Sequence, residues 1–459
     1  MNLSLLEITK ILNIKFNFPE NKLINHINID SRKIEENDVF VAIKGESFDG
    51  HDFVNQAFKN GAIAAIVEKD VEFEDKSKFI IRVDNTIKAM QQIAEFYRSK
   101  FGLKVIGITG SVGKSTVKEM IYAIFSTKFN VVKTEGNQNG QIGLPLSVFN
   151  ITNDHQIAVF EMGISKIGEM ETLAKIAKPD FVVINNIGTS HIGNFGDIDT
   201  IVREKSDISK FSNCKIFANG DNPNLVNYLS NKDNVIYFGF SKKFPYNVES
   251  MSSIGEDTEF ILVTESYKAN IRIPCMGVHN VYNALASIAV ASEFGIHIND
   301  IKNGIKNFES LPMRQNIIKL DKFTLIDDSY NANYDSVRAS IGVLKSIDSH
   351  GKNILVIADI LELGNYSQEI HFELGKYIAS SEIDVLITIG NYSKNIEQGV
   401  LSTGIHLESK HFESNQDAFE YTCEILEDGD KVLVKGSRGM KTDEIVQKLL
   451  DKFGNHEKS

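Results

Sequence analysis

The chain has 459 residues, of which 42% are apolar and 24% are charged, and its formal net charge is -12 at pH 7. This length is too great for a single hydrophobic core and predicts about three domains at roughly 150 residues each. The composition is that of a soluble globular protein. The negative charge gives no electrostatic reason to expect nucleic acid or an anionic membrane as a partner, so an anionic substrate would need local basic groups or metal ions.

Cysteine usage and the N-terminal sequence bear on the compartment of the protein. Cys214, Cys275 and Cys423 are scattered, without metal-ligand spacing or a disulfide framework, as expected for thiols in a reducing cytoplasm. The apolar residues near the N-terminus are interrupted by charges, so we expect neither a signal peptide nor a membrane span. The sequence therefore predicts a cytoplasmic protein that does not insert into a membrane.

Short apolar runs and polar turns alternate in residues 1–95. DVFVAI (38–43) and AIAAIV (62–67) are expected to be strands, and Asp49–Gly50 is expected to be a turn. These features predict a small α/β domain, but they leave its role open.

A stricter alternation of β-branched runs and helical patterns begins at residue 104 and indicates parallel sheets with crossover helices. The first series of runs is KVIGIT (104–109), IAVFEM (157–162), FVVINNI (181–187) and KIFAN (215–219). The second series is FTLIDD (323–328), NILVIAD (353–359), DVLITIG (384–390) and KVLVKGS (431–437). We therefore place a central domain at 96–312 and a C-terminal domain at 313–459.

The stretch GITGSVGKST (107–116) lies between a predicted strand and a predicted helix that begins at about Lys114. A strand, a glycine turn and a helix N-terminus together present backbone N–H groups to an anion, which suits a polyphosphate. Lys114 would reach the outer phosphates, and the Ser115 or Thr116 hydroxyl would meet a magnesium ion. The strict phosphate-loop pattern requires glycine where this chain has Ile108, so a plain tight turn is the alternative.

Two polar residues follow neighbouring predicted strands and are candidates for a metal site. Glu161 closes one run and His191 follows the next, so both would lie at the C-terminal edge of a parallel sheet. A carboxylate suits magnesium, whereas a histidine suits it poorly and is more often a polar loop residue. Lys205 would ordinarily be a solvated charge on a helix.

Taken together, these segments resemble one family, the ATP-dependent Mur ligases of peptidoglycan synthesis. They occur in the family's order over nearly the whole chain, and the family's Gly-Ser-x-Gly-Lys-Ser form accounts for the offset glycine. The matching segments are TGSVGKST (109–116), GNQNGQIGLP (136–145), FEMGIS (160–165), NNIGTSHIGNFG (185–196), REKSDI (203–208), GVHNVYNALAS (277–287), LPMR (311–314), DDSYNAN (327–333) and VLVKGSRGM (432–440).

Within this family, DDSYNAN, VLVKGSRGM and the segment beginning IDSRKI look like the branch that adds D-alanyl-D-alanine to UDP-N-acetylmuramoyl-tripeptide. The acceptor signature of the diaminopimelate-adding and lysine-adding relatives is not apparent, because Asp221-Asn222-Pro223 lies in the wrong domain for it. Two positions depart from the family pattern: Tyr334 replaces a proline, and Ala358-Asp359-Ile360 replaces Gly-Asp-Met.

The resemblance implies three α/β domains: an N-terminal domain that binds the UDP substrate, a central P-loop-type ATPase with a mainly parallel sheet, and a Rossmann-like C-terminal domain that brings the dipeptide. It also implies ATP, two magnesium ions, a carbamylated Lys205 and an acyl-phosphate intermediate. Nothing in the sequence requires more than a monomer. The third residue of the tripeptide, lysine or diaminopimelate, stays open.

The resemblance also implies roles for individual residues. Those implied for catalysis are Lys114, His191 and Lys205. Those implied for ATP are Thr109, Gly110, Ser111, Val112, Gly113, Lys114, Ser115, Thr116, Asn280, Asn283, Arg314 and Asp328. Those implied for metal are Ser115, Glu161, His191 and Lys205. Those implied for the UDP substrate are Ser31, Arg32, Lys44, Asn137 and Asn139. Those implied for the dipeptide are Asn331, Asn333, Lys435, Ser437 and Arg438.

Two other functions remain as alternatives. One is a related ligase that adds a different amino acid, or that adds glutamate to another acceptor, such as a folylpolyglutamate synthase. The other is a nucleotide-driven switch that forms no bond, although a switch would need neither a metal-held lysine nor a second α/β domain. ATP cleavage measured with each acceptor and amine would separate the three.

Overall fold

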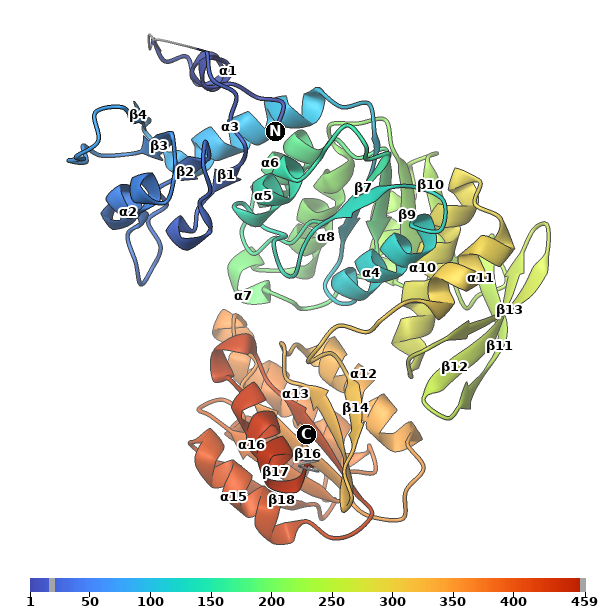
Figure 1. Ribbon diagram of the computed structural model, residues 1–459. Helices are drawn as coiled ribbons and strands as arrows, with labels where there is room; N and C mark the ends of the chain where they lie inside the picture. Colours follow the sequence, from blue (N-terminus) through green and yellow to red (C-terminus); the bar gives the residue numbers. More distant parts are fainter. Residues whose placement is uncertain (16–20, 455–459) are drawn as a thin grey trace.

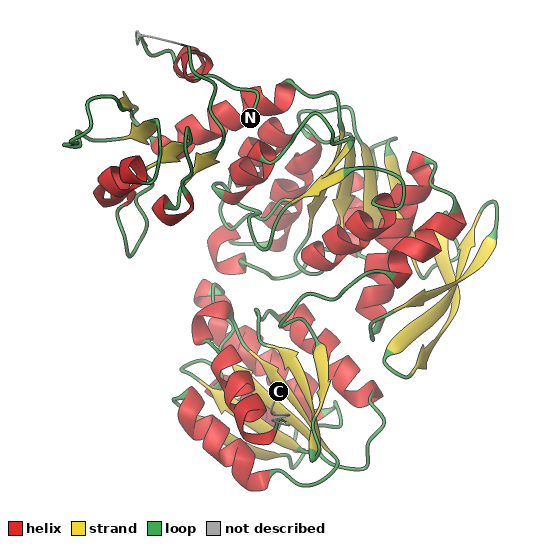
Figure 2. Cartoon of the chain, viewed as in Figure 1, coloured by secondary structure: helices red, strands yellow, loops and turns green. Residues whose placement is uncertain are grey.

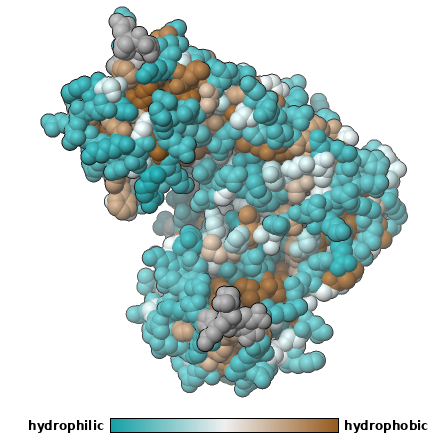
Figure 3. Space-filling model, viewed as in Figure 1, coloured by the Kyte–Doolittle hydropathy of each residue, from teal (hydrophilic) through white to brown (hydrophobic). Residues whose placement is uncertain are grey.

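The computed structural model describes residues 1–15 and 21–454, and three β-sheets follow one another along this part of the chain (Figure 1). Each sheet has its own flanking helices, so the molecule consists of three α/β domains of different size (Figure 2). The outer face in Figure 3 is mostly hydrophilic and is hollowed where the N-terminal and C-terminal domains face one another. The predicted class of three α/β domains is confirmed.

The N-terminal domain has a four-stranded parallel sheet in the order β1-β2-β3-β4. All residues of β2 and β3 are buried, because helices cover both faces of these strands. The elements are α1 (Leu5–Ile11), β1 (Ile27–Asn28), η1 (Ser31–Lys33), β2 (Val39–Val41), η2 (Gly50–Phe53), α2 (Val54–Lys59), β3 (Ala64–Val67), β4 (Phe79–Arg82) and α3 (Thr86–Ser99).

Helix α3 joins the N-terminal domain to the central domain and packs against α5 and α6 of the latter. Its apolar face carries Met90, Ile93 and Tyr97 into a core shared with the central domain, and the Tyr97 hydroxyl donates to the carbonyl of Ile151 at 2.8 Å. Gln91, which follows Met90 in the same helix, donates through its side-chain amide to the carbonyl of Gln141 at 3.0 Å. The connector is therefore part of the core and not a loose linker.

The central sheet has nine strands in the order β13-β12-β11-β10-β9-β8-β5-β7-β6. The strands in the spatial order β6-β7-β5-β8-β9-β10-β11 pair in parallel. Strands β11, β12 and β13 form an antiparallel extension that the sequence pattern did not predict. The strands are β5 (Lys104–Thr109), β6 (Val131–Lys133), β7 (Ile157–Glu161), β8 (Phe181–Ile184), β9 (Lys215–Asn219), β10 (Val235–Gly239), β11 (Tyr246–Ile254), β12 (Asp257–Thr264) and β13 (Lys268–Ile273).

Helices cover both faces of the parallel part of this sheet. Alternate strand residues such as Ile108 and Val183 pack against α4, α10 and α11, and the residues between them, such as Phe160 and Val182, pack against the opposite helix layer. The helices are α4 (Lys114–Phe125), α5 (Gly143–Phe149), α6 (Glu169–Ala177), α7 (Ile192–Phe195), α8 (Ile198–Ser206), η3 (Asp207–Ser209), α9 (Pro223–Leu229), α10 (Val278–Phe294) and α11 (Ile298–Lys306).

The C-terminal domain has a six-stranded sheet in the order β14-β15-β19-β16-β17-β18, and only the edge strand β14 is antiparallel. The strands are β14 (Asn316–Lys319), β15 (Phe323–Asp328), β16 (Asn353–Ala358), β17 (Val385–Ile389), β18 (Glu408–Phe412) and β19 (Asp430–Lys435). The helices are α12 (Tyr334–Ser346), η4 (Gly364–Tyr366), α13 (Ser367–Ala379), α14 (Lys394–Ser402), α15 (Asn415–Ile425), η5 (Arg438–Met440) and α16 (Asp443–Phe453).

Both departures from the family pattern fit local structure. Tyr334 is the first residue of α12, where a proline would also fit because the N–H of that position has no partner within the helix. β16 ends at Ala358, and the Asp359 carboxylate accepts hydrogen bonds from the backbone N–H groups of Asn391, Tyr392 and Ser393. Neither substitution disturbs the surrounding fold.

None of the helices in the described part of the chain combines the length and the apolar character that crossing a bilayer requires.

Candidate active site

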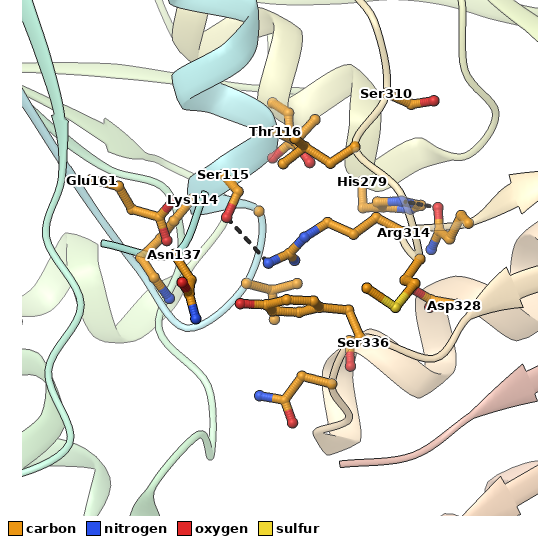
Figure 4. A pocket seen from close by; sticks show the side chains of 18 of the residues that line it. Lys114, Ser115, Thr116, Asn137, Glu161, His279, Ser310, Arg314, Asp328 and Ser336 are labelled. Atoms are coloured by element: carbon orange, nitrogen blue, oxygen red, sulfur yellow. Dashed lines mark hydrogen bonds between the residues drawn. The ribbon is translucent and has the colours of Figure 1, made fainter. Parts of the chain in front are cut away.

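A cleft of about 1000 Å³ lies between the central and C-terminal domains. Figure 4 shows its two walls, with Lys114, Glu161 and Asn137 on the central side and Arg314 and Asp328 on the C-terminal side. The predicted site residues that line it are Ser111, Val112, Gly113, Lys114, Ser115, Thr116, Asn137, Asn139, Glu161, His191, Asn280, Asn283, Arg314, Asp328, Asn331, Asn333 and Lys435. Segments far apart in the sequence therefore meet around one cavity.

The glycine turn after β5 needs its glycines for two physical reasons. Gly110 and Gly113 have φ angles of 149° and 82°, which residues other than glycine rarely adopt. A Cβ atom on Gly113 would also lie 2.4 Å from the Asn283 side-chain oxygen and 2.5 Å from the Asn185 side-chain nitrogen. Helix α4 begins at Lys114, as predicted, so its N-terminus opens into the cleft.

Side-chain amides hold this turn in place. The Asn186 side-chain oxygen accepts hydrogen bonds from the backbone N–H groups of Ser111 and Val112 at 3.1 and 2.8 Å. The Asn185 side-chain nitrogen donates to Asn283 Oδ1 at 2.8 Å, and the Asn283 side-chain nitrogen donates to Asn280 Oδ1 at 2.9 Å. Asn280 and Asn283 thus share one face of α10, as predicted, and they also tie that helix to the turn.

Two lysines, the half-buried Lys114 and the buried Lys205, converge on one backbone carbonyl behind the turn. Lys114 Nζ and Lys205 Nζ donate to the carbonyl of Gly110 at 2.9 and 3.3 Å. Lys205 is 1% exposed and forms no ion pair with any of the described residues. Burial, reinforced by the charge of Lys114, holds the pKa of Lys205 well below its usual range, and burial also lowers the pKa of Lys114. Lys205 is therefore not a solvated helix charge.

Glu161, the last residue of β7, carries a carboxylate oxygen without a partner. Its Oε1 accepts from the Asn139 side-chain amide at 2.7 Å, whereas its Oε2 is buried and makes no hydrogen bond to residues 1–15 or 21–454. A buried, unpartnered carboxylate oxygen at a cleft fits a hard cation such as Mg²⁺. The described residues contain no group of three or more His, Cys, Asp and Glu side chains placed to hold a metal ion. Further donors for a cation would therefore have to come from other groups.

His191 lines the same cleft and adopts the left-handed conformation, with a φ of 60°, immediately before α7. Its ring nitrogen Nδ1 contacts the Glu362 carboxylate of the C-terminal domain. Sequence reasoning missed Glu362, because no pattern within one domain reports a partner on another.

Arg314 brings a positive charge from the C-terminal side to the phosphate turn. Its guanidinium stacks 4.2 Å from the ring centre of Tyr330 and donates to the Ser115 hydroxyl at 3.2 Å (Figure 4). Tyr330 was not predicted as a site residue, although it lies within the DDSYNAN segment. Arg314 is thus held against the first turn of α4.

The predicted dipeptide residues separate into two groups. Lys435 is 1% exposed, and its Nζ contacts the Asp328 carboxylate at 2.5 Å and the Asn331 carbonyl at 3.0 Å. It is therefore a buried partner of Asp328 and not a plain surface charge. Ser437 and Arg438 do not line the cleft: the Ser437 hydroxyl accepts from the backbone N–H of Leu361 at 2.9 Å, and Arg438 lies 3.3 Å from Asp443.

The residues predicted for the UDP substrate also divide. Asn137 and Asn139 line the cleft, whereas Ser31, Arg32 and Lys44 lie on the N-terminal domain outside it. Arg32 is exposed and its guanidinium pairs with Asp30 through two hydrogen bonds of 2.9 and 2.8 Å. Ser31, Arg32 and Lys44 therefore lie apart from the cleft.

The sequence of the chain is similar to known protein families along most of its length. Family models match residues 23–98 (Mur ligase family, catalytic domain), 108–291 (Mur ligase middle domain) and 313–438 (Mur ligase, glutamate ligase domain). A UDP-N-acetylmuramoyl-tripeptide--D-alanyl-D-alanine ligase from Bacillus subtilis (strain 168) is 37% identical over 439 residues, which cover 94% of each chain.

Solved structures agree with these matches. The crystal structure of MurF from Acinetobacter baumannii superposes with a TM-score of 0.87 at 29% identity, over 97% of this chain and 98% of that one. MurF ligase from Thermotoga maritima in complex with ADP superposes with a TM-score of 0.80 at 28% identity, over 93% and 98% of the two chains. The chain belongs to the Mur ligase family.

Proposed function

We propose that the chain is an ATP-dependent ligase that adds D-alanyl-D-alanine to UDP-N-acetylmuramoyl-tripeptide and so completes the pentapeptide precursor of peptidoglycan. The observation that carries this proposal is the cleft itself. In it the glycine turn at residues 110–113, here called the phosphate turn, the buried Glu161 carboxylate and Lys114 face Arg314 of the C-terminal domain, and the buried Lys205 contacts the turn through the Gly110 carbonyl. The full-length similarity to UDP-N-acetylmuramoyl-tripeptide--D-alanyl-D-alanine ligases supports the choice of substrates.

Two anions must meet in the first step, because the terminal carboxylate of the tripeptide attacks the γ-phosphorus of ATP. An oxygen–phosphorus bond forms, the bond to the bridging oxygen breaks, and ADP leaves with that electron pair. Lys114 and Arg314 lie at the start of α4 and would offset the repulsion between the reactants. The dipeptide amine then attacks the acyl phosphate, loses a proton and expels inorganic phosphate, which leaves an amide.

Magnesium ions, when bound, would neutralise charge on the phosphate oxygens and on the attacking carboxylate. We propose Ser115, Glu161, His191 and Lys205 as the protein groups that hold them. The unpartnered Glu161 oxygen supports this set.

Lys205 fits the set only as a carbamate, in which its neutral amine has combined with CO₂ and released a proton. An ammonium would repel a cation, whereas a carbamate supplies anionic oxygen donors. Burial of Lys205 beside Lys114 without a carboxylate partner supports this chemistry, because a new anion would be attracted to the neighbouring ammonium.

The remaining substrate contacts are proposed from where each residue lies relative to the cleft. We propose that Ser31, Arg32 and Lys44 bind the uridine end, with Asn137 and Asn139 nearer the peptide, and that Asn280, Asn283 and Asp328 bind the nucleoside of ATP. Asn331 and Asn333 line the cleft on the side that would receive the dipeptide, and Lys435 supports them through the Asn331 carbonyl. Ser437 and Arg438, which lie outside the cleft, would act on the dipeptide only after a local rearrangement.

One assay tests the proposed function. Phosphate release from ATP is measured with each candidate acceptor and each candidate amine. Release is expected only with UDP-N-acetylmuramoyl-tripeptide and D-alanyl-D-alanine together. Release without any acceptor would favour a nucleotide switch, and release with a folate acceptor and glutamate would favour the related ligase. Parallel runs with lysine-containing and diaminopimelate-containing tripeptides would identify the third residue.

Replacing Arg314 with alanine should lower kcat/KM for ATP by about 10²-fold, because a donor preorganised at the phosphates is lost. The control is Arg338→Ala. Arg338 is an exposed arginine of α12 that stacks 4.7 Å from the Tyr377 ring and does not line the cleft. Steady-state kinetics of both variants would decide, since equal effects would show that Arg314 has no specific role.

We also propose that the enzyme acts as a cytoplasmic monomer. Both walls of the cleft are lined by residues of this chain, so the site as proposed does not require a second copy, and the three cysteines are free thiols. Sedimentation of the purified protein with and without nucleotide tests the oligomeric state.

A further inference from the structure

Glu362 of the C-terminal domain meets His191 of the central domain at the edge of the cleft. A carboxylate oxygen of Glu362 contacts His191 Nδ1, and the backbone N–H of Gly193 donates to the Glu362 carbonyl at 3.2 Å. Glu362 has a φ of 64° and His191 a φ of 60°, so both side chains are presented by left-handed backbone. Glu362 therefore approaches the site through both its side chain and its main chain.

The loop that carries Glu362, residues 359–366, is fixed within its own domain before it reaches His191. The backbone N–H of Ile360 donates to Nε2 of the fully buried His371 at 3.0 Å. The N–H of the next residue, Leu361, donates to the Ser437 hydroxyl. A rigid loop presents a side chain with less loss of conformational entropy than a mobile one.

The 359–366 loop also docks closely on α7. A Cβ atom added to Gly193 would lie 2.5 Å from the backbone nitrogen of Gly364, so the two main chains meet without room for a side chain. The Tyr366 hydroxyl donates to the carbonyl of Gly196 at 2.7 Å. The contact between His191 and Glu362 is thus one part of a fitted interface.

We propose that Glu362 is a positioning residue for His191 and makes the cation site depend on docking of the C-terminal domain. A carboxylate oxygen only accepts hydrogen bonds, so of the two neutral forms of the ring the one with its proton on Nδ1 suits this contact, and that form keeps a lone pair on Nε2. A histidine ligand oriented through its second nitrogen by a carboxylate binds a metal more tightly. This inference rests on the proposed function, because it takes His191 as a cation ligand.

The chain offers a matched comparison. Glu362→Ala removes the acceptor for Nδ1, and Glu362→Gln keeps an acceptor oxygen of equal reach without the charge. Tyr366→Phe removes a different hydrogen bond between the same two domains and leaves His191 untouched. The three variants therefore separate orientation of the ring from adhesion of the domains.

The first readout is binding of Mn²⁺ to the ADP-loaded enzyme, measured by electron paramagnetic resonance. Glu362→Ala should weaken the apparent Mn²⁺ affinity by roughly 10- to 100-fold, Glu362→Gln should weaken it less, and Tyr366→Phe should leave it unchanged. The second readout is the ¹⁵N spectrum of histidine-labelled enzyme, in which His191 should lose its Nδ1–H form in Glu362→Ala.

Unchanged Mn²⁺ affinity in Glu362→Ala would overturn the proposal, and so would an equal loss in Tyr366→Phe, which would assign Glu362 to domain adhesion alone. These outcomes differ from a failure of the proposed function. That failure would show as wild-type enzyme that releases no phosphate with the two substrates.

Discussion

Lys205→Ala should lower kcat by on the order of 10²- to 10³-fold, because the variant loses a preorganised charge at the point where the two anionic reactants meet. Small carboxylates such as formate or acetate should restore part of the activity, since they can occupy the space left by the side chain and supply anionic oxygens in place of the carbamate. Phosphate release with both substrates, measured over a series of carboxylate concentrations, is the readout.

The control for this experiment is Lys210→Ala. Lys210 follows α8 by a few residues, is 44% exposed in its side chain and pairs with Glu171 at the surface, so its loss should leave kcat unchanged. Full activity in Lys205→Ala would eliminate the carbamate role. Loss of activity without any recovery in carboxylate would point instead to an ordinary structural lysine.

Lys114→Met should abolish most activity, with a fall in kcat of about 10³-fold, because the charge at the phosphate turn is removed while the apolar length of the side chain is kept. The same substitution should raise the Tm of the ligand-free enzyme. Burial lowers the pKa of Lys114, so the folded chain disfavours the charged form that the unfolded chain holds at neutral pH, and removing the amine removes that cost.

Calorimetry and kinetics on the same preparation test this pair of effects together. A variant that is less active and also less stable would indicate general damage to the turn. Lys114→Arg is a useful companion, because it keeps the charge and should retain more activity than Lys114→Met while it disturbs the fit around the Gly110 carbonyl.

Much of the framework was predictable because it follows from local patterns. The strands β5, β9 and β15 have the predicted bounds, and α4 begins at Lys114 as expected. The antiparallel strands β11 to β13 escaped prediction because one of their faces is exposed, so they lack continuous apolar runs. Strand β8 ends at Ile184, earlier than predicted, because the next two side chains, Asn185 and Asn186, turn to bind the phosphate turn.

The site was predictable where the chemistry is carried by a motif and obscure where it depends on contacts between domains. The positions of Glu161 at the end of β7 and of Lys114 at the start of the helix that follows β5 both follow from parallel-sheet topology. The burial of Lys435 against Asp328 and the approach of Glu362 to His191 arise only when segments more than 100 residues apart come together. Periodicity within one segment carries no information on such pairs.

The packing of α3 has a consequence for which substrates fit. Helix α3 packs against α5 and α6, and its Gln91 donates a hydrogen bond to Gln141 beside the cleft. We therefore expect the distance between the surface around Arg32, on the N-terminal domain, and the phosphate turn, on the central domain, to stay constant. A UDP-linked acceptor anchored at one end must then be long enough to bring its far carboxylate to the other. The fixed spacing of the N-terminal and central domains would then exclude UDP-linked precursors that carry only a dipeptide or no peptide, because their carboxylate would not reach the phosphate turn. This exclusion would not depend on recognition of any peptide side chain.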